Sequence, residues 1–278
     1  DFVASLLEKD GPLSCAIPDF EQRSEQVEMA RAVSEAFSQG GRLIVEAGTG
    51  VGKSLAYLLP AALHALTTNK RVVISTNTIN LQEQLLSKDV PIVVKALSTV
   101  DELRDADLRF TQLKGRANYL CLPRWRHLRA SDTLSESEAR MVAKTLVWLK
   151  ITSTGDRSEL NLGHKSAASP WERLSAQGAQ KCQGVDGVCF LRAAREKAAA
   201  SHLVIVNHAL LLSDVTAGGS LIPNYDILII DEAHHLEDEA TRHLSFNLRH
   251  AHMEDRIRSI LGERGLFNEA VTAFRGSS

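Results

Sequence analysis

The sequence predicts an α/β fold, with a parallel sheet flanked by helices and a mainly helical insertion in the chain. Three observations predict it. Short apolar runs alternate with helix-like segments near the start of the chain, which favours parallel strands joined by helices. This rhythm stops after about residue 105 and returns with the apolar run 203–206. A glycine-rich segment, residues 46–54, connects a predicted strand to a predicted helix.

Each predicted element follows from a local pattern. Apolar residues recur at helical spacing from Val27 to Phe37, and Gly40 and Gly41 end that helix. The remaining predictions are a strand at 42–45, a helix from the glycine-rich segment through Leu66, a strand at 71–75, a helix around 80–86, helices at 138–150 and 190–200, and strands at 203–206 and 226–230.

The composition narrows the class of protein. The chain is 44% hydrophobic and 24% charged, as expected of a globular protein. It has neither a membrane-length apolar run nor a visible secretory leader, so we expect a cytoplasmic protein without membrane partners. The net charge of −2 does not favour nucleic-acid binding, but a local basic groove is compatible with it. The chain begins with Asp1, and we expect it to be a piece of a longer polypeptide.

Residues 46–54, Glu-Ala-Gly-Thr-Gly-Val-Gly-Lys-Ser, have the composition of a phosphate-binding loop. Glycines let backbone N–H groups converge on phosphate oxygens, where a Cβ would block the approach. We expect Lys53 to reach the outer phosphates of a nucleoside triphosphate and the Ser54 hydroxyl to be a ligand of Mg²⁺. Ala47 occupies the position where the first glycine of such a loop usually stands.

Two adjacent carboxylates follow the apolar run 227–230, which is the end of a predicted buried strand. Parallel sheets bind ligands at this edge. We expect Asp231 to hold Mg²⁺ and Glu232 to orient or deprotonate the water that attacks the γ-phosphate. His234 would link the nucleotide site to neighbouring motifs. The two segments together predict an enzyme that hydrolyses ATP with Mg²⁺ and uses Lys53, Asp231, Glu232 and His234.

Further segments make the chain resemble the first motor domain of a superfamily 2 helicase and, within that group, the DinG/XPD family. A phosphate loop that begins with alanine is typical of helicases. The resemblance covers most of residues 20 to 240, and the segments that carry it are Phe-Glu-Gln-Arg-Ser-Glu-Gln at 20–26, Ser-Thr-Asn-Thr at 75–78, Leu-Gln-Glu-Gln-Leu at 81–85, Lys-Gly-Arg-Ala-Asn-Tyr-Leu-Cys at 114–121, Thr-Gly-Asp-Arg-Ser-Glu-Leu at 154–160 with Trp171, Val-Asn-His-Ala-Leu-Leu at 206–211 and Asp-Glu-Ala-His at 231–234.

The resemblance implies a RecA-like domain of an ATP-dependent DNA helicase that moves 5′ to 3′ on single-stranded or forked DNA. It also implies a bacterial, nucleoid-associated DNA-repair protein with a second RecA-like domain. We expect this chain to lack that second domain, and therefore to bind nucleotide weakly and unwind nothing alone. The implied domains are 1–113 and 201–240 for the motor, 114–200 for an iron–sulfur-type insertion and 241–278 for the start of a helical arch domain.

The resemblance also implies individual contacts. Nucleotide contacts fall at Arg23, Gln26, Ala47, Gly48, Thr49, Gly50, Val51, Gly52, Lys53 and Ser54. DNA contacts fall at Thr76, Asn77, Thr78 and Gln82.

Cysteines in the insertion raise the question of a metal site. The family holds a [4Fe–4S] cluster with four thiolates, and Cys121, Cys182 and Cys189 lie in the matching region. A fourth ligand is not identified, since Cys15 precedes the motor core. A cluster, a metal-free insertion and a site for zinc or another metal all stay open.

The role of the basic and aromatic residues in the insertion also stays open. They could stack on bases and pair with phosphates, or Trp125 could pack the core of the insertion. The residues concerned are Tyr119, Arg124, Trp125, Arg126 and Arg129.

The function of the whole protein has three further interpretations. It could be a nuclease-fused protein of the same family, or a nucleic-acid clamp that does not unwind. RNA could also take the place of DNA as the substrate.

Overall fold

The computed structural model describes residues 2–48, 50–160, 170–177 and 187–245, together with residues 257 and 261. The chain divides into two units, Asp1–Glu239 and Ala240–Ser278, and the boundary falls inside helix α12 (Leu236–Leu244). The first unit contains the sheet and the insertion. Across the described residues, no helix combines the length and the apolar character needed to cross a membrane.

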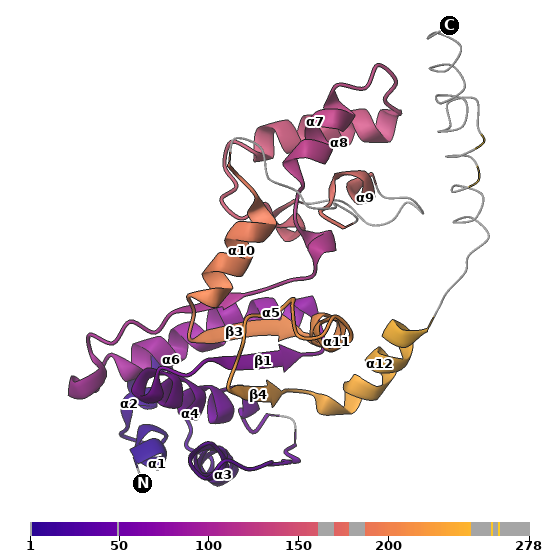
Figure 1. Cartoon of the computed structure of the whole chain (residues 1–278). Helices are drawn as coiled ribbons and strands as arrows, with labels where there is room; N and C mark the ends of the chain where they lie inside the picture. The colour runs from indigo at the N-terminus through magenta and orange to yellow at the C-terminus, as the bar shows by residue number, and fades with distance from the viewer. Residues whose placement is uncertain are drawn as a thin grey trace, which may run out of the picture. The chain divides into compact units, whose positions relative to one another are not determined.

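A four-stranded parallel sheet forms the centre of the first unit, with the strand order β2-β3-β1-β4 (Figure 1). The strands are β1 (Val72–Thr76), β2 (Phe110–Gln112), β3 (Leu203–Asn207) and β4 (Ile227–Ile230). All of β1 and nearly all of β3 are buried, as expected for central parallel strands. The predicted parallel α/β fold is confirmed. Strand β2 is an addition that the sequence pattern did not predict.

The predicted strand at 42–45 is not formed. Ile44 is 97% exposed, and Leu43 and Val45 are also exposed, which is incompatible with a buried paired strand. Strand β4 pairs with β1, and none of the described residues pairs with its other edge. An apolar run favours strand structure, but a strand also needs a partner edge in register, and that is decided by distant parts of the chain.

Helices cover the sheet of the motor core (Figure 1). Five of these helices are α3 (Ser24–Gln39), α4 (Lys53–Thr68), α5 (Ile79–Gln84), α6 (Val90–Leu97) and α11 (His208–Thr216). A π-helical turn, η1 (Leu85–Asp89), joins α5 to α6. The shorter elements are α1 (Phe2–Leu6), α2 (Pro12–Ala16) and the 3₁₀ turns η2 (Asp101–Leu103) and η5 (Ala233–His235).

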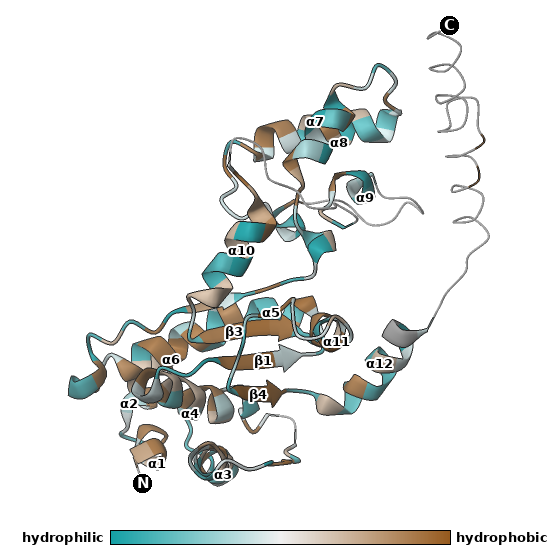
Figure 2. Ribbon diagram, viewed as in Figure 1, coloured by the Kyte–Doolittle hydropathy of each residue, from teal (hydrophilic) through white to brown (hydrophobic). Residues whose placement is uncertain are grey.

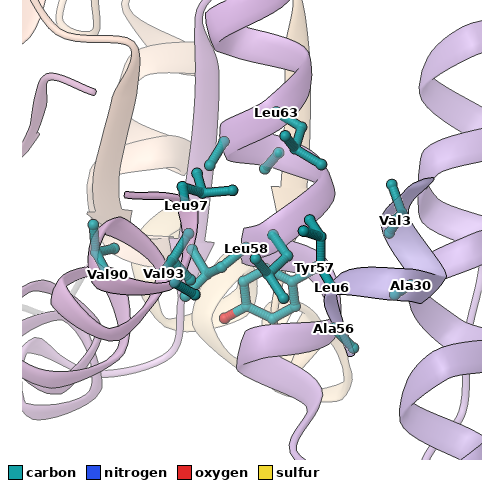
Figure 3. Packing of buried hydrophobic residues seen from close by; sticks show 14 of the residues in the cluster. Val3, Leu6, Ala30, Ala56, Tyr57, Leu58, Leu63, Val90, Val93 and Leu97 are labelled. Carbon is teal, nitrogen blue, oxygen red and sulfur yellow. The ribbon is translucent and has the colours of Figure 1, made fainter. Parts of the chain in front are cut away.

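Helix α4 lies at the centre of the main hydrophobic core. Tyr57 and Leu58 of α4 face Val90 and Val93 of α6 (Figure 3), and all four side chains are buried. Figure 2 shows hydrophobic residues concentrated along β3 and β4. Burial of this apolar surface fixes the first turn of α4, which is also the end of the phosphate loop.

The insertion has a hydrophobic core of its own. Its elements are η3 (Arg116–Asn118), α7 (Leu122–Arg129), α8 (Glu136–Trp148), η4 (Arg157–Glu159), α9 (Trp171–Leu174) and α10 (Phe190–Ala199). Trp125, Trp148 and Trp171 pack together with Leu120 and Leu174. Helix α8 begins at a capping box, in which Ser135 and Glu138 bond to each other's backbone N–H groups.

A buried lysine joins the insertion to the motor core. The side chain of Lys114 is 1% exposed, and its Nζ lies 2.7 Å from Oδ2 of Asp156 in the insertion and 2.8 Å from Oε1 of Glu83 in α5. It also donates to the Ser158 hydroxyl at 3.1 Å. The three donors of the ammonium are therefore matched by three acceptors. Two carboxylates offset the cost of burying this charge.

Candidate nucleotide and nucleic-acid site

The phosphate loop has the backbone shape that phosphate binding requires. Gly50 and Gly52 have φ angles of +85° and +82°, a region that favours glycine. Gly52 is also the N-cap of α4, so the free N–H groups of the first helical turn follow the loop directly. A Cβ on Gly52 would lie 2.2 Å from Nε2 of Gln26, so a larger residue there would also displace the Gln26 amide. Thr49 lies outside the described residues.

Two residues before the loop hold it in place. Nε2 of the buried Gln26 donates to the carbonyl of Gly52 at 2.9 Å, and Nη1 of Arg23 donates to the carbonyl of Gly50. Arg23 and Gln26 are expected nucleotide contacts, and the structure brings both to the loop. In this arrangement their side chains bind loop backbone. The sequence alone did not predict this contact.

Asp231 and Glu232 lie at the carboxyl end of β4. The backbone N–H of Asp231 donates to the carbonyl of Ser75 at 2.8 Å, which continues the β1–β4 pairing to the first carboxylate. Glu232 has a φ of +53°, a left-handed conformation that is unfavourable for a residue with a Cβ. Such backbone strain is concentrated at functional sites, where surrounding contacts maintain it.

Lys53 and Glu232 connect the two halves of the site. Nζ of Lys53 lies 3.2 Å from Oε1 of Glu232, and each side chain is about one-third exposed, 30% and 29%. Lys53 is the first residue of α4, so the phosphate loop and the Asp-Glu-Ala-His segment meet at one edge of the sheet. The lysine is positioned to meet an incoming phosphate, and the carboxylate is positioned next to it.

A tyrosine that sequence reasoning missed contacts the first carboxylate. The Tyr57 hydroxyl donates to Oδ2 of Asp231 at 3.1 Å. Burial is the main cause that raises the pKa of both groups, and the nearby Glu232 raises the pKa of Asp231 further. Tyr57 lies four positions after Lys53 on α4, and this helical spacing is the only sequence signal for it.

Ser54 and Asp231 offer oxygen donors of the kind that Mg²⁺ prefers. The Asp231 carboxyl is half-buried, and like-charge repulsion from Glu232 disfavours its ionised form. A divalent cation would relieve this repulsion, so the residues present fit the implied ion. Ser54 and Asp231 would hold it.

Two histidines lie near the carboxylate pair. His234 is exposed, its Nδ1 lies 3.6 Å from Oε2 of Glu232, and its ring contacts the His235 ring in a tilted arrangement. His208 is fully buried, and its Nδ1 lies 2.7 Å from the hydroxyl of Ser75. Burial lowers the pKa of His208, so the neutral ring is favoured. His208 therefore ties the start of α11 to β1, next to the nucleotide site.

The expected DNA contacts divide into accessible and buried residues. Thr78 is exposed and Asn77 is half-buried at the carboxyl end of β1. Thr76 is buried within that strand. Gln82 is fully buried, and its Nε2 donates to the carbonyls of Leu113 at 3.0 Å and Ile205 at 2.7 Å. These bonds use the Gln82 amide to attach α5 to the sheet, and a DNA contact at Gln82 stays a prediction.

The aromatic residues of the insertion are also committed to packing. Trp125 is buried, and its indole donates to the Thr145 hydroxyl at 2.7 Å. Tyr119 is buried, and its hydroxyl accepts from the Lys114 backbone at 3.0 Å. Arg129 lies over the Trp125 ring. These rings are not available to stack on bases, which favours a packing role for Trp125 in the core of the insertion.

The cysteines of the insertion do not supply a complete set of cluster ligands. Cys121 is buried beside Tyr119 and Ala176, and Cys189 is the N-cap of α10. Cys182 lies outside the described residues. Cys15, in α2, completes the four cysteines of the chain. Within the described part of the chain, the only group of three metal-type ligands is Glu232, His234 and His235.

A phosphate loop and a carboxylate pair at the carboxyl edge of a parallel sheet define a P-loop nucleoside triphosphatase domain. Comparison with known protein families narrows this class. The DEAD/DEAH box helicase family matches residues 27–101, and the DEAD_2 family matches residues 86–253, which is more than half of the chain. The chain belongs to the DEAD_2 family, the DinG/XPD-like group of DEAD/DEAH helicases.

Individual proteins similar to this chain are named as helicases or as an exonuclease of the DinG type. The chain is 37% identical over 268 residues to the ATP-dependent DNA helicase YoaA of Haemophilus influenzae, and the match covers 93% of this chain and 40% of that protein. It is 39% identical over 239 residues to the ATP-dependent helicase DinG of Mycobacterium tuberculosis, covering 79% and 35%. It is 34% identical over 270 residues to the 3′-5′ exonuclease DinG of Bacillus subtilis, covering 96% and 28%. The chain thus spans less than half the length of these relatives.

Proposed function

We propose that this chain is the ATP-binding motor part of a DNA helicase. The observation that carries the proposal is the 3.2 Å contact between Lys53 and Glu232, which joins the phosphate loop to the carboxylate pair. The family membership and the helicase names of the relatives support the same activity. ATP and Mg²⁺ are the expected ligands.

A few side chains would carry out ATP binding and hydrolysis. The loop N–H groups and Lys53 bind the phosphates and offset the charge that develops on the outer phosphate. Ser54 and Asp231 would hold Mg²⁺, which would neutralise phosphate charge. Glu232 loses its contact with Lys53 as the lysine turns to the phosphate, and its carboxylate then accepts a proton from the attacking water or orients it. Gln26 and Arg23 keep the loop in the shape that receives the phosphates.

Movement on DNA requires a second motor domain. We propose that it closes over the nucleotide and that closure changes the grip on a single strand passing Asn77 and Thr78. An arginine supplied by a partner domain accelerates hydrolysis by several orders of magnitude in related phosphoryl-transfer systems. The 5′ to 3′ polarity, the forked DNA substrate and the nucleoid association belong to this proposal.

We propose that the insertion is maintained by its apolar core. Trp125, Trp148 and Trp171 fill this core, whereas a [4Fe–4S] cluster needs four ligands and three cysteines lie in the insertion. An iron and sulfide assay on an anaerobic preparation tests this. Four irons per chain would overturn it.

The test of the motor uses a protein that joins this chain to a second motor domain. Lys53→Ala should abolish DNA-stimulated ATP hydrolysis and unwinding of a forked duplex, while binding to single-stranded DNA is retained. Lys95→Ala, a change of an exposed lysine on α6, is the matched control. Unchanged hydrolysis in Lys53→Ala would reject the proposal. Absence of hydrolysis in the unmodified protein, with DNA binding intact, would favour a nucleic-acid clamp. A matched RNA duplex distinguishes the two nucleic acids.

A further inference from the structure

Glu83 is a carboxylate of the motor core that contacts the residue holding the insertion. It lies on α5, and its Oε1 is 2.8 Å from Nζ of Lys114. The same Nζ lies 2.7 Å from Oδ2 of Asp156 in the insertion. The backbone N–H of Leu113, the preceding residue, donates to the carbonyl of Ile205 in β3 at 2.9 Å, so the lysine is anchored to the sheet. One ammonium therefore connects a helix of the motor core to the insertion.

On the side of the insertion, this contact is held by several hydrogen bonds. Oδ1 of Asp156 accepts from the backbone N–H of Ser158 at 2.9 Å and caps the 3₁₀ turn η4. Asp156 also pairs with Tyr119 in an isolated antiparallel bridge. The Tyr119 hydroxyl accepts from the backbone N–H of Lys114 at 3.0 Å. A displacement of Lys114 would thus reach two segments of the insertion, η4 and the chain at Tyr119.

On the side of the motor core, the contact is made by the helix that begins at the expected DNA contacts. The Thr78 hydroxyl caps α5 by accepting from a backbone N–H at 3.2 Å, and Asn77 directly precedes it. Gln82 attaches the same helix to the sheet. Helix α5 has six residues and is about 9 Å long. Glu83 and Thr78 therefore belong to one short helix, and a force on one of them reaches the other.

The burial of Lys114 does not by itself require Glu83. One ammonium needs one opposite charge, and Asp156, whose side chain is 8% exposed, supplies it. The side chain of Glu83 is 40% exposed, and ion pairs of exposed groups contribute little to stability. The group of three side chains holds two carboxylates and one ammonium, so its charge is not balanced. What Glu83 adds is a connection from Lys114 to α5.

We propose that Glu83 is a positioning residue that joins the insertion to the expected DNA contacts Asn77 and Thr78, by way of α5 and Lys114. This inference rests on the proposed helicase function. A strand that is pulled past Asn77 and Thr78 is separated from its complement only if the surrounding protein does not yield. The contacts from Thr78 through Glu83 and Lys114 to Asp156 form a continuous path that keeps the insertion fixed to α5. Without Glu83, less of the hydrolysed ATP is used for unwinding.

The first test uses the protein that joins this chain to a second motor domain. In Glu83→Ala, the number of base pairs unwound per ATP hydrolysed should fall at least about fivefold, while hydrolysis stimulated by single-stranded DNA stays within about twofold. Glu83→Gln should keep at least about half of the unwinding per ATP, because its amide oxygen still accepts from Lys114. Glu28→Ala, at an exposed position of α3, is the matched control.

The ratio of unwinding to hydrolysis separates positioning from a purely structural role. Partial unfolding of a variant would lower both activities equally and leave the ratio unchanged. An unchanged ratio in Glu83→Ala would therefore overturn the proposal.

The second test needs neither nucleotide nor a second motor domain. In this chain, Glu83→Ala should make the backbone amides of α5 and η4 exchange with deuterium at least about threefold faster, with no change in α8. Unchanged exchange in both α5 and η4 would overturn the proposal. Absence of ATP hydrolysis by the unmodified two-domain protein would instead reject the proposed function, and the exchange rates would still decide whether Glu83 joins the two parts.

Discussion

Nζ of Lys53 lies 3.2 Å from Oε1 of Glu232, although the two residues are 179 positions apart in the sequence. The lysine of the phosphate loop is thus paired with the carboxylate that is expected to act on the attacking water. A phosphate group that enters the loop competes for the same ammonium. Nucleotide binding and release of the Glu232 carboxylate are therefore linked in this geometry.

The first prediction separates binding from hydrolysis. Glu232→Gln keeps the size of the side chain and removes its basicity, so ATP hydrolysis should fall by about 10²–10⁴-fold while nucleotide affinity changes little. The ion pair is partly exposed and stabilises the fold by at most about 1 kcal/mol, so the melting temperature should change little. Single-turnover hydrolysis and nucleotide titration measure the two effects in the two-domain protein. An equal loss of affinity and rate would contradict the assignment.

The second prediction concerns the hydroxyl of Tyr57. Tyr57→Phe removes the bond to Asp231 and leaves one carboxylate oxygen without its partner, so the free energy of unfolding should fall by about 1–3 kcal/mol. Mg²⁺ with nucleotide gives Asp231 a new partner. The difference in free energy of unfolding between Tyr57→Phe and the unmodified chain should therefore be smaller when Mg²⁺ and nucleotide are present. Urea unfolding with and without Mg²⁺–nucleotide measures this. A difference that stays constant would show that Tyr57 acts only in packing.

The third prediction concerns the lysine between insertion and motor. Lys114→Met has nearly the same volume but leaves the buried Asp156 carboxylate without its ammonium, so the free energy of unfolding should fall by about 3–5 kcal/mol. Lys150→Met, at an exposed position, is the control and should be within about 0.5 kcal/mol of the unmodified chain. If Lys114→Met unfolds at the same urea concentration as the control, the lysine does not hold the insertion.

The fourth prediction is a pH dependence. Burial and the charge of Arg109 lower the pKa of His202 from 6.5, and the ring accepts a bond from the Arg109 backbone N–H at 3.2 Å. A group with a lowered pKa in the folded state contributes stability that is complete above pH 6.5 and is lost as pH falls toward the folded pKa. Urea midpoints between pH 8 and pH 5 should therefore decrease below about pH 6.5.

His202→Gln should make that decrease shallower without abolishing it, because burial also lowers the pKa of His64 and His208. The nearby Asp107 opposes the shift at His202 and Arg71 adds to it. If the urea midpoint of His202→Gln falls with pH as steeply as that of the unmodified chain, His202 does not contribute to the pH dependence of stability.

Local sequence patterns predicted much of the fold. The glycine-rich segment, the apolar run before Asp231 and the helical periodicities gave the α/β class, two of the helices in the insertion and the two halves of the nucleotide site. These features depend on neighbouring residues, because backbone conformation at glycine and helical burial patterns are set within a few positions. They did not predict β2, whose three residues are too few to form a pattern.

Contacts between distant residues were decided by the tertiary structure. The residues 42–45 are apolar enough for a strand, but they are exposed because they have no partner edge. Gln82 resembles a DNA contact in sequence, yet its amide is buried against two carbonyls of the sheet. Tyr57, which contacts Asp231, has no motif of its own.

The sequence by itself determined which residue types are available for binding phosphate and Mg²⁺, because that chemistry depends on glycines, a lysine and carboxylates in short segments. Only the tertiary structure decided which side chains surround those groups. Tyr57 reaches Asp231 because α4 packs into the main hydrophobic core, and packing of this kind depends on the whole core.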